Sequence, residues 1–148
     1  MITEDYVSFE TAKLLKEKGF DAELKMYWSM GTFDIPILHC CPQHLVDDGE
    51  EPMPIEIDNS GIECTSRSNP WKPEEFECIA PTLQMVMKWL RKMHNIHIYT
   101  IDTFIGFKYV IQDMLHHDED IHPIDGICFS SNEEAAEAAI KYCLENLI

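Results

Sequence analysis

The sequence predicts an α+β fold, in which three helices cover a small, mostly antiparallel sheet. Three stretches of the chain repeat apolar residues at helical spacing, and each begins near a residue that commonly starts a helix. Short alternating or β-branched runs lie between them and are typical of strands. The chain of 148 residues is expected to form a single domain, residues 1–148, because this length supports one hydrophobic core.

The first helix is expected from Phe9 to Lys18. Ser8 precedes it and suits the N-cap position, because a serine hydroxyl can accept a hydrogen bond from a backbone N–H of the first turn. Gly19 follows it, and glycine readily adopts the left-handed conformation that ends many helices. The sequence therefore predicts both ends of this helix.

Two strands are expected next, from Leu24 to Trp28 and from Phe33 to His39. Pro36 lies within the second of them. Since proline has no N–H to donate to a neighbouring strand, this strand is expected at an edge of the sheet or is broken.

The segment from Pro42 to Glu77 differs from the rest of the chain. It has five prolines, many acidic residues and little periodicity, which is unusual for a long stretch inside a small domain. We expect an irregular, mobile excursion that contains two short strands, 55–57 and 62–64, which could pair as a hairpin. Trp71 and Phe76 are candidate partner-binding residues, because a tryptophan between two prolines is hard to bury and aromatic side chains often anchor interfaces.

Two further helices are expected, from Pro81 to His94 and from Asn132 to Leu147. Pro81 suits the first position of a helix, where its missing N–H costs nothing. Ser131 and Glu134 match a capping box, in which the serine accepts the N–H of the glutamate and the carboxylate reaches back to the cap. The residues expected to face the core are Leu83, Val86, Met87, Leu90 and Met93, followed by Ala136, Ala139, Ile140, Cys143 and Leu147.

Three more strands are expected between these two helices, at 96–101, 107–113 and 124–129. They follow one another with short connections, so an antiparallel meander is the simplest arrangement. The expected order is therefore helix, two strands, irregular segment, helix, three strands, helix.

Three stretches of the chain resemble a family of small uncharacterised proteins from anaerobic gut bacteria and their phages and mobile elements. The stretches are ITEDYVSFE with LLKEKGF (2–10 and 14–20), APTLQM with MKWLR (80–85 and 87–91), and EEA with AAIKYCLENL (133–135 and 138–147). The resemblance implies a bacterial or phage protein of the cytoplasm. The family carries no known activity, so the resemblance assigns no functional residue.

The charge of the chain limits its partners. Asp and Glu number 27 against 11 Lys and Arg, which gives a net charge of -16. Such a chain lacks the basic surface of a nucleic-acid-binding protein and is repelled by anionic membranes, whereas a basic protein would be attracted. The start of the sequence shows no secretory signal, and no apolar run approaches the roughly 20 residues of a membrane helix, so a cytoplasmic location with free thiols is expected.

No catalytic or cofactor-binding pattern appears, since the Gly-x-Ser-x-Gly and phosphate-binding glycine motifs are absent from the sequence. The leading hypothesis is a non-enzymatic protein-interaction module. The alternative is a metal-binding protein or metal-dependent hydrolase that uses the loop from His116 to His122, because imidazole and carboxylate groups bind transition metals. Its candidate ligands are His116, His117, Asp120 and His122, and a second candidate zinc set is Cys41, His44, Cys64 and Cys78.

Overall fold

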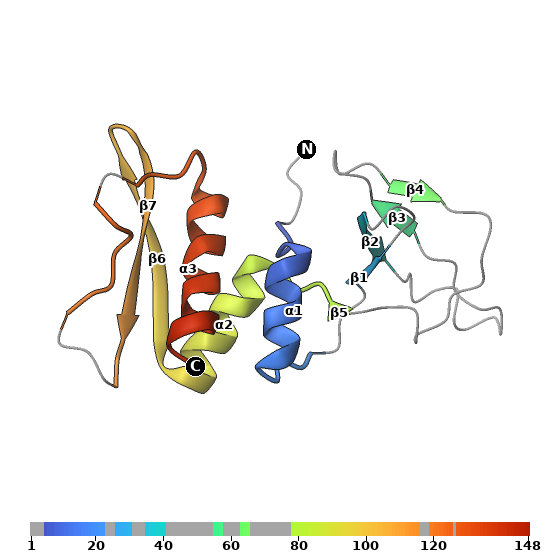
Figure 1. The fold of residues 1–148 in the computed structure, drawn as a ribbon, viewed down its shortest axis with the longest axis horizontal. Coiled ribbons are helices and arrows are strands. Elements are labelled where there is room, and N and C mark those ends of the chain that lie inside the picture. The colour runs from blue at the N-terminus through green and yellow to red at the C-terminus, as the bar shows by residue number, and fades with distance from the viewer. Residues whose placement is uncertain are drawn as a thin grey trace. The chain divides into compact units, whose positions relative to one another are not determined.

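The computed structural model describes residues 5–22, 26–30, 35–40, 55–57, 63–65, 78–115, 119–125 and 127–148. In these ranges the chain forms three helices and two small antiparallel sheets (Figure 1), which confirms the α+β class but divides the predicted sheet into two. The chain falls into two compact units, Met1–Glu4 with Ser8–Pro81 and Asp5–Val7 with Thr82–Ile148. The single-domain organisation stays a prediction.

The helix of the first unit, α1 (Phe9–Glu17), has the two ends that the sequence predicts. The Ser8 hydroxyl accepts a hydrogen bond from a backbone N–H of the first turn at 3.3 Å. At the other end Gly19 takes a left-handed conformation with φ of 77°, and the Phe20 N–H donates to the Leu15 carbonyl at 2.9 Å. This is the hydrogen bond of a Schellman cap, which requires the freedom of glycine.

The sheet of the first unit has five short strands in the order β4-β3-β2-β1-β5, and all neighbouring strands are antiparallel. Its strands are β1 (Met26–Met30), β2 (Pro36–Cys40), β3 (Ile55–Ile57), β4 (Glu63–Thr65) and β5 (Cys78–Ile79). The pairing of β3 with β4 confirms the short hairpin predicted inside 42–77. The rest of that segment, with its predicted mobility, lies outside the described residues.

The predicted edge position of β2 is wrong. This strand lies between β1 and β3, so it is interior to the sheet. Pro36 is its first residue, opposite Met30 of β1, and β3 pairs only with Leu38–Cys40. The missing N–H therefore falls outside the stretch that both neighbours share, which is where a sheet tolerates proline.

One side of α1 supplies the core of the first unit. The ring of Phe9 meets Trp28 of β1 edge to face, with 6.2 Å between the ring centroids, and α1 also contacts β5. The buried apolar residues of this unit are Phe9, Ala12, Leu15, Phe20, Met26, Leu38, Cys78 and Ala80.

In the second unit, α2 (Leu83–His94) begins later than predicted. Thr82 is its N-cap, and the Thr82 hydroxyl accepts the N–H of Met85 at 3.3 Å. Pro81 therefore precedes the cap instead of occupying the first helical position, because the threonine supplies a side-chain acceptor that proline lacks. Asn95 ends the helix in the left-handed conformation, with φ of 56°.

The last helix, α3 (Asn132–Asn146), begins at Ser131 as predicted, and the Ser131 hydroxyl accepts the Glu134 N–H at 3.1 Å. The second half of the expected capping box is displaced by one residue. The Glu134 carboxylate accepts the hydroxyl of Ser130 at 2.6 Å and its N–H at 3.1 Å, and these bonds lower the pKa of Glu134. The start of the helix is thus held from both Ser130 and Ser131.

Two long strands, β6 (Ile96–Thr103) and β7 (Gly106–Asp113), form an antiparallel hairpin in the second unit. Their register pairs Thr103 with Gly106 and continues without interruption to Ile96 and Asp113. The helix α3 packs against both strands, while α2 contacts β6 and α3 (Figure 1). The helices therefore cover one face of this narrow sheet.

The third strand predicted at 124–129 does not form. The chain makes two isolated bridges to β7 instead, one at Ile121 and one at Phe129. Between them Pro123 has no N–H to donate, and the Ile127 N–H donates to the Ile124 carbonyl at 3.0 Å in a turn. Proline and turn together interrupt the pairing that a continuous strand would need.

The core of the second unit lies between α3, α2 and the helix-facing side of the hairpin. Alanines on α3 let its backbone approach the sheet closely, and Ile140 fills the space beside them. Most of the predicted core is confirmed, but Met93 is 66% exposed and Met87 and Leu147 are half-buried. Its buried residues include Val7, Leu83, Val86, Leu90, Ile96, Ile98, Tyr109, Val110, Ile111, Asp113, Ala135, Ala136, Ala139, Ile140, Cys143 and Leu144.

None of the helices in the described ranges combines the length and the apolar character that crossing a membrane requires.

Replacing Ile140 by alanine is expected to lower the free energy of unfolding by about 2–5 kcal/mol, because a fully buried isoleucine leaves a cavity. Ser131→Ala is expected to cost about 1 kcal/mol, the usual contribution of an N-cap. Glu145→Ala, at an exposed position, should change the stability by less than about 0.5 kcal/mol. Urea unfolding followed by circular dichroism measures all three, and equal losses for Glu145→Ala and Ile140→Ala would contradict this packing.

Burial raises the pKa of the Cys143 thiol from 9.0 to about 12. Below about pH 9 the Cys143 thiol keeps its proton in both the folded and the unfolded chain. Between about pH 9 and pH 12 only the folded chain keeps it. The free energy of unfolding should therefore fall as the pH rises from about 9 toward 12, by up to about 1.4 kcal/mol per pH unit. Urea unfolding at a series of alkaline pH values should show a shallower fall for Cys143→Ala, and an identical fall would refute this assignment.

Candidate functional site

The predicted ligand and partner residues are only partly described. His116, His117, Trp71 and Phe76 lie outside the described residues, as do Cys41, His44 and the side chain of Cys64. Asp120 and His122 are exposed, and the Asp120 carboxylate accepts the Gln112 side-chain N–H at 3.1 Å. Cys78 is buried. Within the described ranges, no three His, Cys, Asp or Glu side chains are placed to share a metal ion, so both metal sites stay predictions.

Between β7 and α3, the described residues 119–125 and 127–129 run along the outer edge of β7, and we call them the outer segment. The Ile121 N–H and carbonyl exchange hydrogen bonds of 2.8 and 2.9 Å with Ile111. Phe129 does the same with Phe107, also at 2.8 and 2.9 Å. The outer segment is therefore fixed to the sheet near both of its ends.

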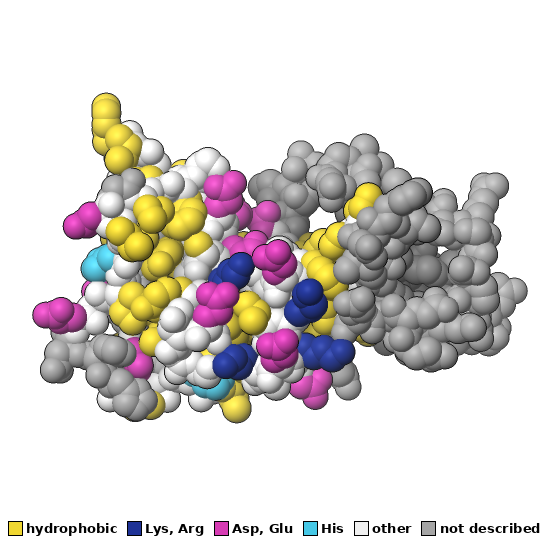
Figure 2. All heavy atoms as spheres, in the orientation of Figure 1, with side chains coloured by type: hydrophobic (Ala, Val, Ile, Leu, Met, Phe, Trp, Pro, Cys, Tyr) yellow, Lys and Arg dark blue, Asp and Glu magenta, His cyan; other side chains and the backbone are white. Residues whose placement is uncertain are grey.

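The outer segment lies in a stretch that carries only negative formal charge. From Lys108 to Lys141 the intervening sequence contains eight Asp and Glu residues and no Lys or Arg. The exposed acids in the described part of this stretch are Glu119, Asp120, Asp125, Glu133 and Glu134. Figure 2 shows acidic side chains along this margin of the second unit. The margin would attract a basic surface.

Two exposed isoleucines lie inside the outer segment. Ile124 is 77% exposed and Ile127 is 44% exposed, and the hydrogen bond between their backbones places them at the two ends of one turn. Both lie in the strand predicted at 124–129, in which one of every two side chains would be covered. The turn instead presents both side chains to solvent, next to the acidic Asp125.

The turn of the β6–β7 hairpin is also apolar, a feature that was not predicted from the sequence. Its two residues are Phe104, which is fully exposed, and Ile105, which is 72% exposed. Figure 2 shows hydrophobic side chains projecting at this end of the hairpin. Gly106 follows with φ of 142°, and a Cβ there would lie 2.7 Å from the Phe129 carbonyl oxygen, so only glycine fits. Hairpin turns usually carry Asn, Asp or Gly. Phe104 and Ile105 depart from this preference, and that departure is the sequence signal by which the apolar turn could have been found.

The register of the hairpin decides which backbone groups face outward. The Met114 N–H donates to the Asn95 carbonyl at 3.0 Å, so these two residues form a hydrogen-bonded pair. Such pairs alternate with non-bonded pairs along an antiparallel hairpin. The backbone groups of the odd-numbered residues of β6 therefore bond to β7, and those of the even-numbered residues point away from β7. In the described part of the chain no backbone hydrogen bond reaches those outward groups. We call this row the free edge, which consists of Ile96, Ile98, Thr100 and Asp102.

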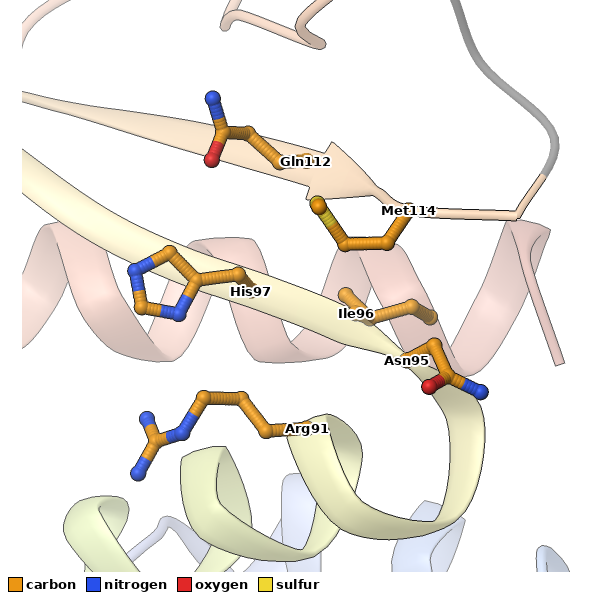
Figure 3. Close-up of a pocket in the computed structure, with 6 residues that line it drawn as sticks. All are labelled: Arg91, Asn95, Ile96, His97, Gln112 and Met114. Atoms are coloured by element: carbon orange, nitrogen blue, oxygen red, sulfur yellow. The ribbon is translucent and has the colours of Figure 1, made fainter.

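A pocket of about 340 Å³ lies at the other end of the hairpin, where α2 turns into β6 (Figure 3). Arg91 reaches toward it from the last turn of α2 and His97 from β6, while Ile96 and Met114 contribute apolar atoms. The lining residues are Arg91, Asn95, Ile96, His97, Gln112 and Met114, none of which is acidic. The pocket therefore suits an apolar group and would tolerate a negative charge at its rim.

Comparison with known proteins adds no assignment. No protein family, no curated protein and no solved structure matches this chain. The resemblance to a gut-bacterial and phage family stays a prediction.

Proposed function

We propose that this protein is a non-enzymatic interaction module that binds a basic protein through the outer segment. The observation that carries the proposal is the exposure of Ile124 and Ile127 within a stretch whose charged side chains are all acidic. Protein interfaces commonly combine an apolar centre with a polar rim. The outer segment offers both features on a backbone that its bridges to β7 hold in place.

The two kinds of side chain would contribute differently. Exposed charges are screened beyond about 8 Å at physiological ionic strength, so the acids would mainly speed the encounter and orient the partner. Burial of an isoleucine side chain contributes about 1.5–3 kcal/mol, so Ile124 would supply much of the affinity. A basic partner with an apolar patch beside its lysines or arginines fits this surface.

The setting of this activity follows the family resemblance. We propose a cytoplasmic protein of a bacterium or of a phage that infects it, acting on another protein without direct contact with nucleic acid or membrane. The net charge of -16 supports the absence of direct contact with nucleic acid and with membranes, because nucleic acids and most membrane surfaces are also negative.

Ile124→Asp is expected to reduce binding at least about tenfold, because it removes the apolar contact while keeping the negative charge. The measurement is capture of proteins from a host lysate on the immobilised full chain, with quantification by mass spectrometry. Ile105→Asp is the matched control, since it changes an equally exposed isoleucine outside the outer segment.

The wild type and Ile105→Asp should retain the same basic proteins, and added salt should release them. Retention by Ile124→Asp at the wild-type level, or retention of acidic proteins alone, would contradict the proposal.

A further inference from the structure

We propose that two copies of this chain pair along the free edges of their β6 strands. The product is a four-stranded antiparallel sheet in the order β7-β6-β6-β7, in which the hairpin turn of each copy rests against the pocket of the other. This inference does not depend on the proposed function, because the outer segment occupies the opposite edge of the sheet, along β7.

Proteins usually prevent edge-to-edge pairing with proline, charged side chains, a bulge or a covering segment. Among the described residues the free edge has one such feature along its length, the charged Asp102, and Arg91 of α2 lies beside its Ile96 end (Figure 3). The β6 sequence IHIYTIDT contains neither proline nor lysine, and its register with β7 is unbroken over all eight residues. The helices α3 and α2 already stabilise the hairpin through one of its faces, but they supply no backbone partners to the outward groups of β6. Pairing with a second copy would supply those partners.

One register of the two strands satisfies the hydrogen bonding and the side chains together. It places Thr100 of one copy opposite Thr100 of the second copy, so that Ile98 faces Asp102. All three belong to the free edge, so their outward N–H and carbonyl groups can bond to one another. On the face away from the helices, exposed Tyr99 then lies opposite exposed Ile101. Aromatic and β-branched cross-strand pairs of this kind stabilise sheets.

The same register explains the apolar hairpin turn. Counting along antiparallel strands from the Thr100 pair, Phe104 lies level with Ile96 of the second copy and Ile105 lies level with Asn95. Both Ile96 and Asn95 line the pocket, together with Met114. The fully exposed Phe104 of each copy would therefore lie at the apolar pocket of the other. The contact is self-complementary, as a two-fold dimer requires.

The charge distribution permits this contact although each chain is strongly acidic. The acids of the outer segment lie along β7, away from the free edge. Asp102 is the one acid of β6, and the register sets it opposite Ile98 of the second copy, on the other face of the sheet from His97. Arg91 and His97 line the pocket without an acid among its lining residues. Pairing therefore brings no two acids of β6 opposite one another.

The test is sedimentation velocity of the full chain from low micromolar to near-millimolar concentration. The wild type should convert from monomer to dimer over this range. Phe104→Asp should weaken the dimer at least about tenfold, because it removes the aromatic ring that would pack on Ile96 and Met114 of the pocket. Thr100→Pro should do the same by removing an outward donor. Ile124→Asp is the control and should dimerise as the wild type does, although the proposed function expects it to lose partner binding.

Folding of each variant is checked by its circular dichroism spectrum, and Phe104→Asp changes no buried side chain. Thr100→Cys tests the register, because opposite residues of a hydrogen-bonded antiparallel pair lie within reach of a disulfide. Mild oxidation should cross-link this variant well above the wild-type background. A wild type that stays monomeric throughout, a dimer unaffected by Phe104→Asp, or a dimer that Thr100→Cys does not cross-link would each overturn the proposal.

Discussion

The alternation of backbone hydrogen bonds in the β6–β7 hairpin is the constraint on which the second unit depends. Each residue pair either bonds across the hairpin or turns its N–H and carbonyl outward. On β7 the outward groups of Phe107 and Ile111 bond to the outer segment. On β6 the corresponding groups form the free edge. Among the described residues one sheet edge is thus occupied and the other is open, and this asymmetry separates the surface proposed for a basic partner from the surface proposed for a second copy.

Packing holds both edges in place. The alanines of α3 bring that helix close to the sheet, and the left-handed Asn95 lets the chain pass directly from α2 into β6. Gly106 allows the hairpin turn to approach the Phe129 carbonyl, which joins the turn to the outer segment. The exposed apolar residues therefore project from a fixed framework, which lowers the conformational entropy that binding would cost.

The helices could be predicted because their signals are local. Ser8, Gly19 and Ser131 act on backbone groups within one turn, and the apolar stripes need only the helical period. The prediction of a third strand at 124–129 was wrong, because such a strand needs unbroken pairing with β7. Pro123 and the turn that follows it interrupt this pairing. For the same reason the outer segment and the free edge could not be read from the sequence, since exposure depends on which neighbour pairs with which strand. The metal ligands His116 and His117 and the aromatic anchors Trp71 and Phe76 stay predictions.

The most direct test of the open edge is residue-resolved amide hydrogen exchange, measured at low and at high protein concentration. The Tyr99 and Ile101 amides, which bond to β7, should be protected at both concentrations. The Ile98, Thr100 and Asp102 amides should exchange rapidly in the dilute protein and become protected in the concentrated protein. Protection of these three amides at every dilution would show that the edge is already occupied within one chain. Rapid exchange at every concentration would show that no second copy occupies it.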